Sequence, residues 1–189
     1  RINPTDTAFW KEDLRAVIPL KPDVIMPTKV NGGAMIREVS ACMAEVERAA
    51  GIEEGTVKIL PLIETAMGVE KAFEIATADA RVIGLFLGGE DFTADLHCKR
   101  TKEGNEIFYA RTRLVCAARA CGIEAYDTPF TDVEDMEGLE KDTEFAKSLG
   151  FAGKAVISPR HVDIVNAVFS PTEAEIAYAH DVMDAIEEG

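Results

Sequence analysis

Residues 57–92 read VKILPLIETAMGVEKAFEIATADARVIGLFLGGEDF and contain a complete strand–helix–strand unit. Val57–Ile63 and Val82–Leu87 are short apolar runs, which are typical of buried strands. Between them, Ala66–Ala78 carries apolar residues at helical spacing. The residues expected to face inward along this helix are Val69, Phe73 and Ala76. Because two strands joined by a crossover helix run parallel, the unit predicts a parallel sheet wrapped by helices.

Strand and helix alternate along the rest of the chain as well. Four further strands are expected, at Arg1–Pro4, Asp23–Met26, Glu124–Tyr126 and Lys154–Ile157. Six further helices are expected, at Thr7–Val17, Ala34–Ala50, Ile107–Cys121, Asp135–Leu149, His161–Phe169 and Thr172–Glu187. The polar stretch 95–105 is predicted to be a loop. Six such units fit an open doubly wound sheet or part of a (β/α)8 barrel, a fold that usually needs about 250 residues.

The bulk composition is that of an ordinary globular domain with an acidic surface. The 189 residues are 47% hydrophobic and 29% charged, and one domain is the default for this length. The formal net charge is −14, which opposes binding to nucleic acids or anionic membranes. No apolar run approaches the roughly 20 residues of a membrane span. We therefore expect no nucleic acid or membrane partner, and an anionic substrate must meet local positive groups or a metal.

The cysteines give no sign of a metal site. There are four, with no CxxC pair and no Cys/His ligand spacing: Cys42, Cys98, Cys116 and Cys121. We expect reduced thiols, most of them in the core, in a cytoplasmic protein.

Two acidic residues that follow apolar runs are the main candidates for chemistry. Glu64 comes directly after one predicted strand, and Asp91 comes shortly after the next one. In α/β proteins the carboxyl ends of successive parallel strands are where catalytic groups meet. Two carboxylates there form an oxygen site suited to Mg²⁺ or Mn²⁺, with water and substrate oxygens completing the shell. Arg1 is a third candidate, because its guanidinium can hold an anionic substrate.

Simpler roles stay open for these and neighbouring residues. A carboxylate at a strand end is often a helix cap or a salt-bridge partner. Glu90 either ligates a metal directly or forms a salt bridge. Arg111, which lies beside Arg113, is expected to form an ion pair on the surface of its helix. Asp127 either shapes the site or makes the turn before Pro129.

Six short motifs occur in one order along the chain. They are RINP at 1–4, VIMPTKV at 24–30, LPLIET at 60–65, GGEDF at 88–92, YAR at 109–111 and AVISP at 155–159. The series resembles the citrate lyase β-subunit branch of the HpcH/HpaI aldolase family, which also contains malyl-CoA lyases. The resemblance covers essentially the whole chain.

The resemblance implies a (β/α)8 TIM barrel, present here as a fragment from about strand three to strand eight. Residues 1–189 would then be a single α/β barrel domain, without barrel strands one and two and without the C-terminal lid segment of relatives. The motif at 155–159 departs from the family, because Ser158 stands where relatives commonly have His. This departure weakens any role of that loop in binding an acyl-CoA.

The resemblance also implies an activity. It is a Mg²⁺-dependent carbon–carbon lyase that cleaves a citryl- or malyl-type CoA or acyl-carrier thioester into an acyl thioester and a 2-oxo acid, such as oxaloacetate or glyoxylate. Glu64 and Asp91 would be the metal ligands, with Mn²⁺ as a possible substitute for Mg²⁺. Arg1 would be catalytic and bind substrate, and the amides of Gly89, Glu90 and Asp91 would bind the substrate carboxylate.

Two other functions are compatible with the same motifs. One is an aldolase of the same family that releases pyruvate and uses no CoA. The other is a non-catalytic subunit or binding module within a complex like citrate lyase, beside partner subunits. Relatives commonly assemble as trimers or hexamers, so the resemblance implies a homo-oligomer.

Overall fold

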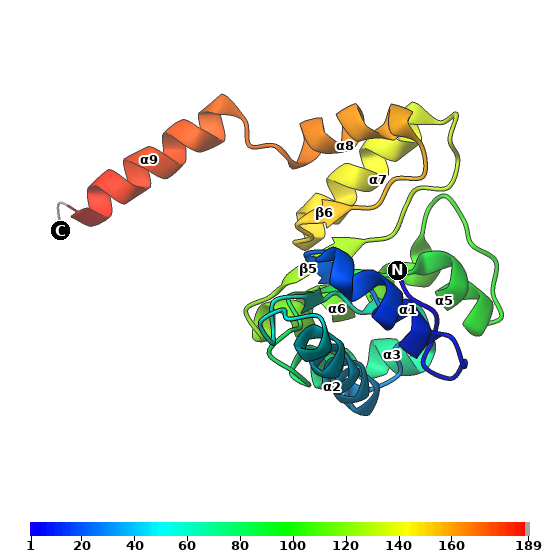
Figure 1. Ribbon diagram of the computed structural model, residues 1–189. Coiled ribbons are helices and arrows are strands. Elements are labelled where there is room, and N and C mark those ends of the chain that lie inside the picture. The colour runs from blue at the N-terminus through cyan, green and yellow to red at the C-terminus, as the bar shows by residue number, and fades with distance from the viewer. Residues whose placement is uncertain (188–189) are drawn as a thin grey trace.

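The computed structural model describes residues 1–187 and shows an α/β fold built on parallel strands (Figure 1). β1 (Val24–Ile25) and β2 (Lys58–Ile59) form one parallel pair. Four strands form a second parallel sheet in chain order: β3 (Leu62–Ile63), β4 (Gly84–Leu87), β5 (Glu124–Asp127) and β6 (Gly153–Lys154). The prediction of parallel strands is confirmed, except that Arg1–Pro4 is not a strand and forms only an isolated parallel bridge between Ile2 and Pro27.

The predicted strand Val57–Ile63 is divided into β2 and β3 around Pro61, which has no N–H to donate. The extended chain nevertheless joins the two sheets. The amide of Leu60 donates to the carbonyl of Ile25 at 2.9 Å, and the amide of Leu62 donates to the carbonyl of Pro27 at 2.9 Å. Successive strand ends therefore lie along one continuous edge.

Helices follow the strands much as the periodicity predicts. They are α1 (Trp10–Val17), α2 (Gly33–Ala49), α3 (Ala66–Glu70), α4 (Ala72–Ala76), α5 (Gly89–Asp95), α6 (Phe108–Ala120), α7 (Met136–Leu149), α8 (Val162–Phe169) and α9 (Glu173–Glu187). Short 3-10 turns occupy Ile18–Leu20, Asn105–Ile107 and Pro159–His161. Helix α5 was not predicted as a separate element.

The helix expected over Ala66–Ala78 is two short helices that meet at Lys71. Phe73 was predicted to face inward, but it is 48% exposed, and Ala72 and Ile75 are buried instead. The other two residues predicted to face inward, Val69 and Ala76, are buried, so the prediction fails only for Phe73, which lies just after the interruption at Lys71.

The core lies between the strands and the helices that cover them. Ile59, Ile63 and Leu85 of the strands are fully buried, as are Met43 of α2 and Leu114 of α6. A smaller apolar cluster beneath α7 and α8 contains Phe130, Leu139 and Val165. The expectation that most cysteines lie in the core is wrong, because none is buried and Cys98 and Cys116 are exposed.

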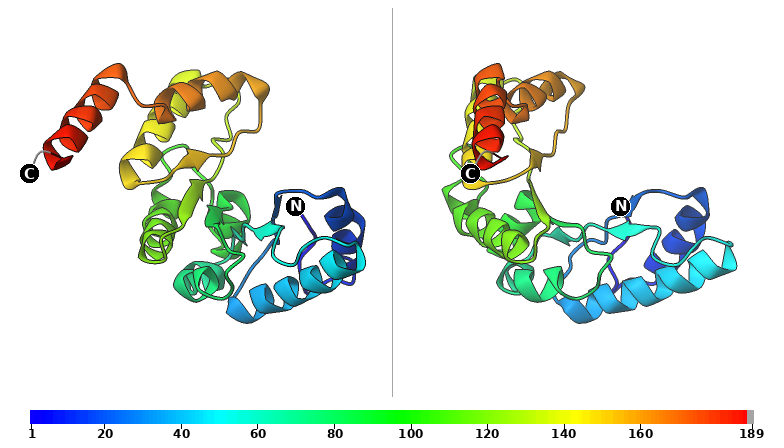
Figure 2. Two further views of the ribbon diagram at one scale, coloured as in Figure 1. Left: turned by 60° about the vertical axis from the view of Figure 1, so that its left-hand side comes forward. Right: turned by 90° about the vertical axis from the view of Figure 1, so that its left-hand side faces the viewer.

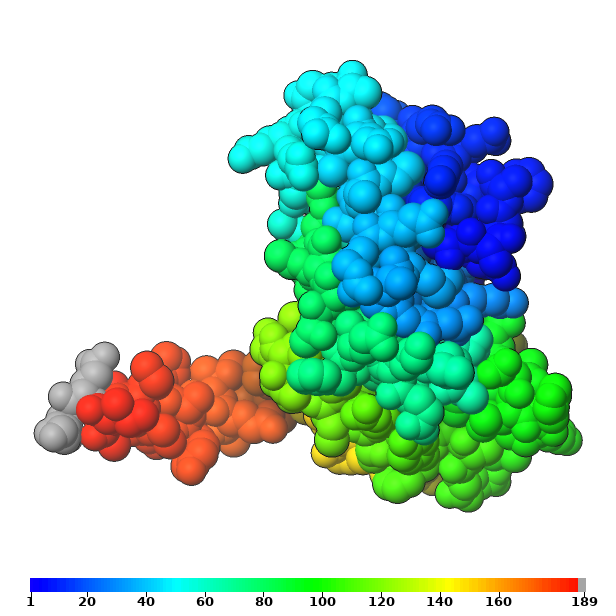
Figure 3. Space-filling model, turned by 90° about the horizontal axis from the view of Figure 1, so that it is seen from below, coloured from blue at the N-terminus to red at the C-terminus, as the bar shows by residue number. Residues whose placement is uncertain are grey.

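The elements follow an open arc from α1 and α2 at one end to α7 and α8 at the other (Figure 2). Helix α9 extends away from this body, and its residues 173–186 are exposed (Figures 1 and 3). Among residues 1–187, no helix has the length and apolar character needed to cross a membrane.

Candidate active site

The structure brings together the three residues that sequence analysis singles out. Glu64 follows β3, Asp91 lies in the first turn of α5 after β4, and Arg1 begins the N-terminal segment. All three line a cavity of about 290 Å³, and all three also line an adjoining cavity of about 350 Å³. The first cavity is also lined by apolar residues, namely Met26, Leu62, Phe86, Pro129 and Ala155.

Glu64 is held firmly within this site. Its carboxylate is almost fully buried, with the residue 3% exposed, and Oε1 accepts a hydrogen bond from the amide of Lys29 at 2.9 Å. Gly88 lies directly against it, since a Cβ added there would stand 2.9 Å from Glu64 Oε2. A side chain at position 88 would push Glu64 aside, and the absence of one lets the backbone approach the carboxylate.

The electrostatics of the site favour a cation. Burial and, to a smaller extent, the nearby Asp91 carboxylate raise the pKa of Glu64 to about 7, although the hydrogen bond from the Lys29 amide opposes the rise. Two carboxylates that repel each other in a partly dry pocket are relieved by a divalent ion. Residues 1–187 contain no cluster of three or more His, Cys, Asp or Glu side chains suited to a metal. The two carboxylates fit Mg²⁺ because this ion usually takes one or two carboxylates and fills its shell with water and substrate.

Arg1 is positioned through its neighbour Ile2. The amide of Ile2 donates to the carbonyl of Met26 at 3.0 Å, and the hydroxyl of Thr28 donates to the carbonyl of Ile2 at 3.1 Å. These bonds attach the N-terminal segment beside the end of β1. Lys29 adds a second positive group, with Nζ 3.9 Å from Asp91 Oδ1.

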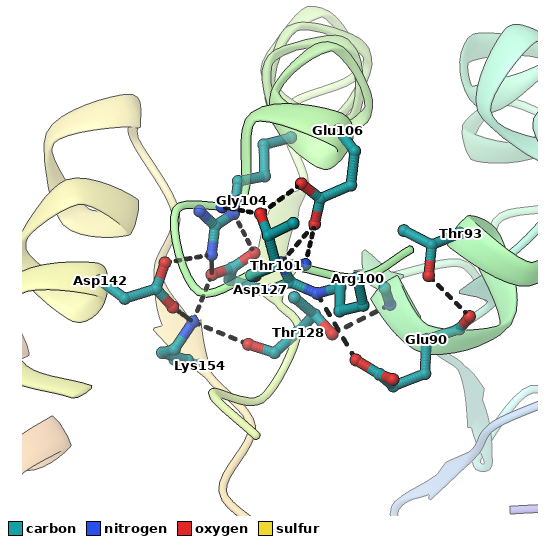
Figure 4. Close-up of polar contacts among 12 residues, drawn as sticks. Glu90, Thr93, Arg100, Thr101, Gly104, Glu106, Asp127, Thr128, Asp142 and Lys154 are labelled. Atoms are coloured by element: carbon teal, nitrogen blue, oxygen red, sulfur yellow. Dashed lines mark hydrogen bonds and ion pairs between the residues drawn. The ribbon is translucent and has the colours of Figure 1, made fainter. Parts of the chain in front are cut away.

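Gly89, Glu90 and Asp91, the three residues expected to bind substrate, begin α5 and differ in the contacts they already make. The side chain of Glu90 is exposed and its Oε1 lies 3.5 Å from the Nε of Arg100, so it forms the salt bridge (Figure 4). The amide of Gly89 already donates to Thr128 Oγ1 at 2.9 Å. Within residues 1–187, the amides of Glu90 and Asp91 donate no hydrogen bond.

A buried cluster of four charges lies behind the site. Arg111 donates to Asp127 at 2.8 and 3.0 Å and to Asp142 at 2.8 Å. Lys154 Nζ lies 2.6 Å from Asp127 Oδ2 and 2.6 Å from Asp142 Oδ2 (Figure 4). The prediction of a surface ion pair for Arg111 is wrong, since Arg111 and Asp127 are both 0% exposed. Asp127 thus anchors the core rather than only making a turn.

A signal for this cluster is present in the sequence. Arg111 lies on the same helical face as Ile107, Leu114, Val115 and Ala118, all of which are buried. An arginine within an apolar stripe requires buried acidic partners. Which acids those are depends on packing between distant segments.

Comparison with known proteins places the chain in a family. Residues 1–159 match the family model described as HpcH/HpaI aldolase/citrate lyase. The chain belongs to this family. The resemblance inferred from the six motifs is therefore confirmed.

Individual relatives agree with this membership. The chain is 44% identical over 188 residues to citrate lyase subunit beta of Leuconostoc mesenteroides subsp. cremoris, covering 100% of this chain and 62% of that protein. The citrate lyase beta subunit of Mycobacterium tuberculosis complexed with oxaloacetate and magnesium has a TM-score of 0.76 and 28% identity. That match covers 90% of this chain and 72% of the other.

A second structure of the Mycobacterium tuberculosis protein CitE, in complex with magnesium, acetoacetate and coenzyme A, has a TM-score of 0.79 at 28% identity. It covers 100% of this chain and 67% of that chain. The chain thus spans 62% of the length of the Leuconostoc protein and somewhat more of the two solved chains.

Proposed function

We propose that this chain supplies the metal and 2-oxo acid site of a carbon–carbon lyase that acts on CoA or acyl-carrier thioesters of the citryl or malyl type. The observation that carries the proposal is the convergence of Glu64, Asp91 and Arg1 on one cavity at the carboxyl ends of parallel strands. The products would be an acyl thioester and a 2-oxo acid such as oxaloacetate or glyoxylate. The Mycobacterium tuberculosis relatives, complexed with oxaloacetate or with coenzyme A, support this substrate class.

Glu64 and Asp91 would hold Mg²⁺, or Mn²⁺ in its place. A divalent ion bound there supplies a Lewis acid for the negative charge that develops on a keto oxygen when the adjacent carbon–carbon bond breaks. Magnesium in the complexes of the relatives supports this choice of metal.

The protein groups of the site would orient the substrate. Arg1 would hold a carboxylate or a developing oxyanion through its planar guanidinium. The amides of Glu90 and Asp91 would bind the substrate carboxylate. Gly88 and Gly89 would allow that close approach, although the amide of Gly89 is engaged by Thr128. The apolar wall that includes Met26, Leu62 and Phe86 would exclude water from one side.

We further propose that the two parallel sheets belong to one (β/α)8 barrel, from about strand three to strand eight, in a single domain. Residues 188 and 189 of that domain lie outside the described residues. A cytoplasmic homo-oligomer, with citrate-lyase-type partner subunits, is part of the same proposal. Ser158 caps the turn before α8, its Oγ accepting from the amide of Arg160 at 3.4 Å, and it lines neither cavity of the site.

Calorimetric titration and product analysis test this function. We expect oxaloacetate to bind only in the presence of Mg²⁺, and citryl- or malyl-CoA to be cleaved to an acyl thioester and an oxo acid. Cleavage of a free hydroxy-oxo acid with release of pyruvate, and not of the thioester, would instead show a CoA-independent aldolase. Metal-dependent binding without turnover of any thioester would show a non-catalytic binding subunit.

The raised pKa of Glu64 predicts how pH and metal act on stability. In the unfolded chain Glu64 ionises near its ordinary pKa of 4.5, but in the folded protein it holds its proton up to about 7. The folded state therefore binds more protons between these values. Without metal, Glu64 costs the folded protein about 3 kcal/mol as pH rises from 4.5 to 7.

Mg²⁺ should recover this stability only where Glu64 is ionised. We expect Mg²⁺ to raise the melting temperature more at pH 8 than at pH 5, as measured by thermal unfolding. Glu64→Gln should lose most of this difference, because glutamine does not titrate. An equal effect of Mg²⁺ at both pH values in the wild-type protein would contradict the prediction.

A further inference from the structure

Thr128 lies where the buried charge cluster meets the candidate active site. Its carbonyl accepts a hydrogen bond from Lys154 Nζ at 2.8 Å, and its Oγ1 accepts one from the amide of Gly89 at 2.9 Å (Figure 4). The residue is 1% exposed, and it lines the same cavity as Glu64 and Asp91. The cluster thus fixes the backbone of Thr128 at the cavity wall.

The hydroxyl of Thr128 has a donor that the protein does not use. A threonine hydroxyl carries one O–H donor and two acceptor lone pairs. The Gly89 amide uses one lone pair, and Thr128 Oγ1 donates no hydrogen bond to any atom of residues 1–187. A hydroxyl that already accepts from an N–H is polarised into a better donor. Because buried donors are normally paired, this proton is available to a ligand in the cavity.

We propose that the Thr128 hydroxyl donates a hydrogen bond to a carboxylate oxygen of the bound 2-oxo acid and is a substrate-binding residue. This assignment rests on the function proposed above. The cavity also holds the carboxylates of Glu64 and Asp91 beside the guanidinium of Arg1, so a neutral donor aids an anionic substrate without adding repulsion.

The position of Thr128 indicates which carboxylate it contacts. Thr128 Oγ1 accepts a hydrogen bond from the amide of Gly89. The next two residues, Glu90 and Asp91, have amides that donate to no protein acceptor within residues 1–187. The hydroxyl and these amides therefore serve the same carboxylate, the one attached to the keto carbon. That group is common to oxaloacetate and pyruvate, so Thr128 contributes equally to the binding of both.

The test compares Thr128→Val, which removes the hydroxyl at nearly the same volume, with Thr128→Ser, which retains it. Thr93→Val is the matched control, since Thr93 is a buried threonine of α5 whose hydroxyl donates to the carbonyl of Glu90 and which does not line the cavity. Calorimetry measures the affinity for Mg²⁺ alone, and then for oxaloacetate and for pyruvate with saturating Mg²⁺. Circular dichroism checks that each variant is folded.

We expect Thr128→Val to lower the affinity for both oxo acids about 10- to 100-fold, which is typical of the loss of a hydrogen bond to a charged group. Mg²⁺ affinity should stay unchanged, and Thr128→Ser and Thr93→Val should bind like the wild type. An equal loss of Mg²⁺ affinity would show that Thr128 only positions the turn carrying Asp91 and would overturn the assignment. Retained oxo acid binding in Thr128→Val, or a loss confined to oxaloacetate, would also overturn it. A wild-type protein that binds no oxo acid would overturn the proposed function as well.

Discussion

Arg111→Met is expected to lower the free energy of unfolding by about 3–5 kcal/mol, the range measured when one partner of a buried ion pair is removed. Methionine retains much of the volume of the side chain but leaves Asp127, Asp142 and Lys154 in the core with one excess negative charge. Arg111 makes three of the hydrogen bonds that compensate for the desolvation of these two carboxylates. The effect on stability should therefore be large even though the residue lies outside the cavity.

Arg119→Met is the matched control on the same helix. Arg119 pairs with Glu124 at 2.8 Å, but both side chains are nearly half exposed. The substitution should therefore lower the free energy of unfolding by at most about 1 kcal/mol. Urea unfolding followed by circular dichroism measures both values. If the two variants had equal free energies of unfolding, the buried cluster would contribute no more to stability than an exposed ion pair.

Glu64→Gln and Asp91→Asn should each abolish Mg²⁺-dependent binding of oxaloacetate, with a loss of affinity of roughly 100-fold or more. Removal of a group that only supports a metal ligand already costs about 10- to 100-fold, and these residues are proposed as the ligands themselves. The amide side chains keep the shape of the carboxylates but remove their charge. Calorimetric titration with and without Mg²⁺ measures the effect.

Glu90→Gln provides the control for Asp91→Asn, because it removes a carboxylate from the same turn of α5. The exposed side chain of Glu90 pairs with Arg100, so its loss should change the affinity less than about fivefold. If Glu90→Gln weakened oxaloacetate binding as much as Asp91→Asn, the negative charge of this turn, rather than ligation of the metal by Asp91, would account for the binding. Oxaloacetate binding by Glu64→Gln that still required Mg²⁺ would exclude Glu64 as a ligand.

Much of the fold and the outline of the site could be predicted from local patterns. Short apolar runs alternate with helical periodicity, and this alternation predicts parallel strands with covering helices. Glu64 and Asp91 each follow such a run, and parallel strands place their carboxyl ends along one edge. Glu64 and Asp91, which are 27 positions apart (91 − 64), line one cavity because β3 and β4 are neighbouring parallel strands.

Other features depend on contacts between segments that no local pattern connects. Helical spacing correctly predicted that Val69 and Ala76 are buried, but it did not predict the interruption at Lys71 or the exposure of Phe73. Arg111 sits in an apolar stripe of α6, but its partners Asp127 and Asp142 come from β5 and α7. Which charges form pairs depends on their distance in space and on the exclusion of water. The spacing of residues along the chain gives neither of these.

The sequence by itself determined the alternation of elements, the family and the two carboxylates at the strand ends, because these depend on periodicity and on ordered motifs. The tertiary structure alone decided that Gly89 is engaged by Thr128 and that Lys154 holds the carbonyl of Thr128. These bonds join α5, the end of β5 and β6, and they form only once packing has brought the three together. Long-range packing therefore determines which donors are free to meet a substrate.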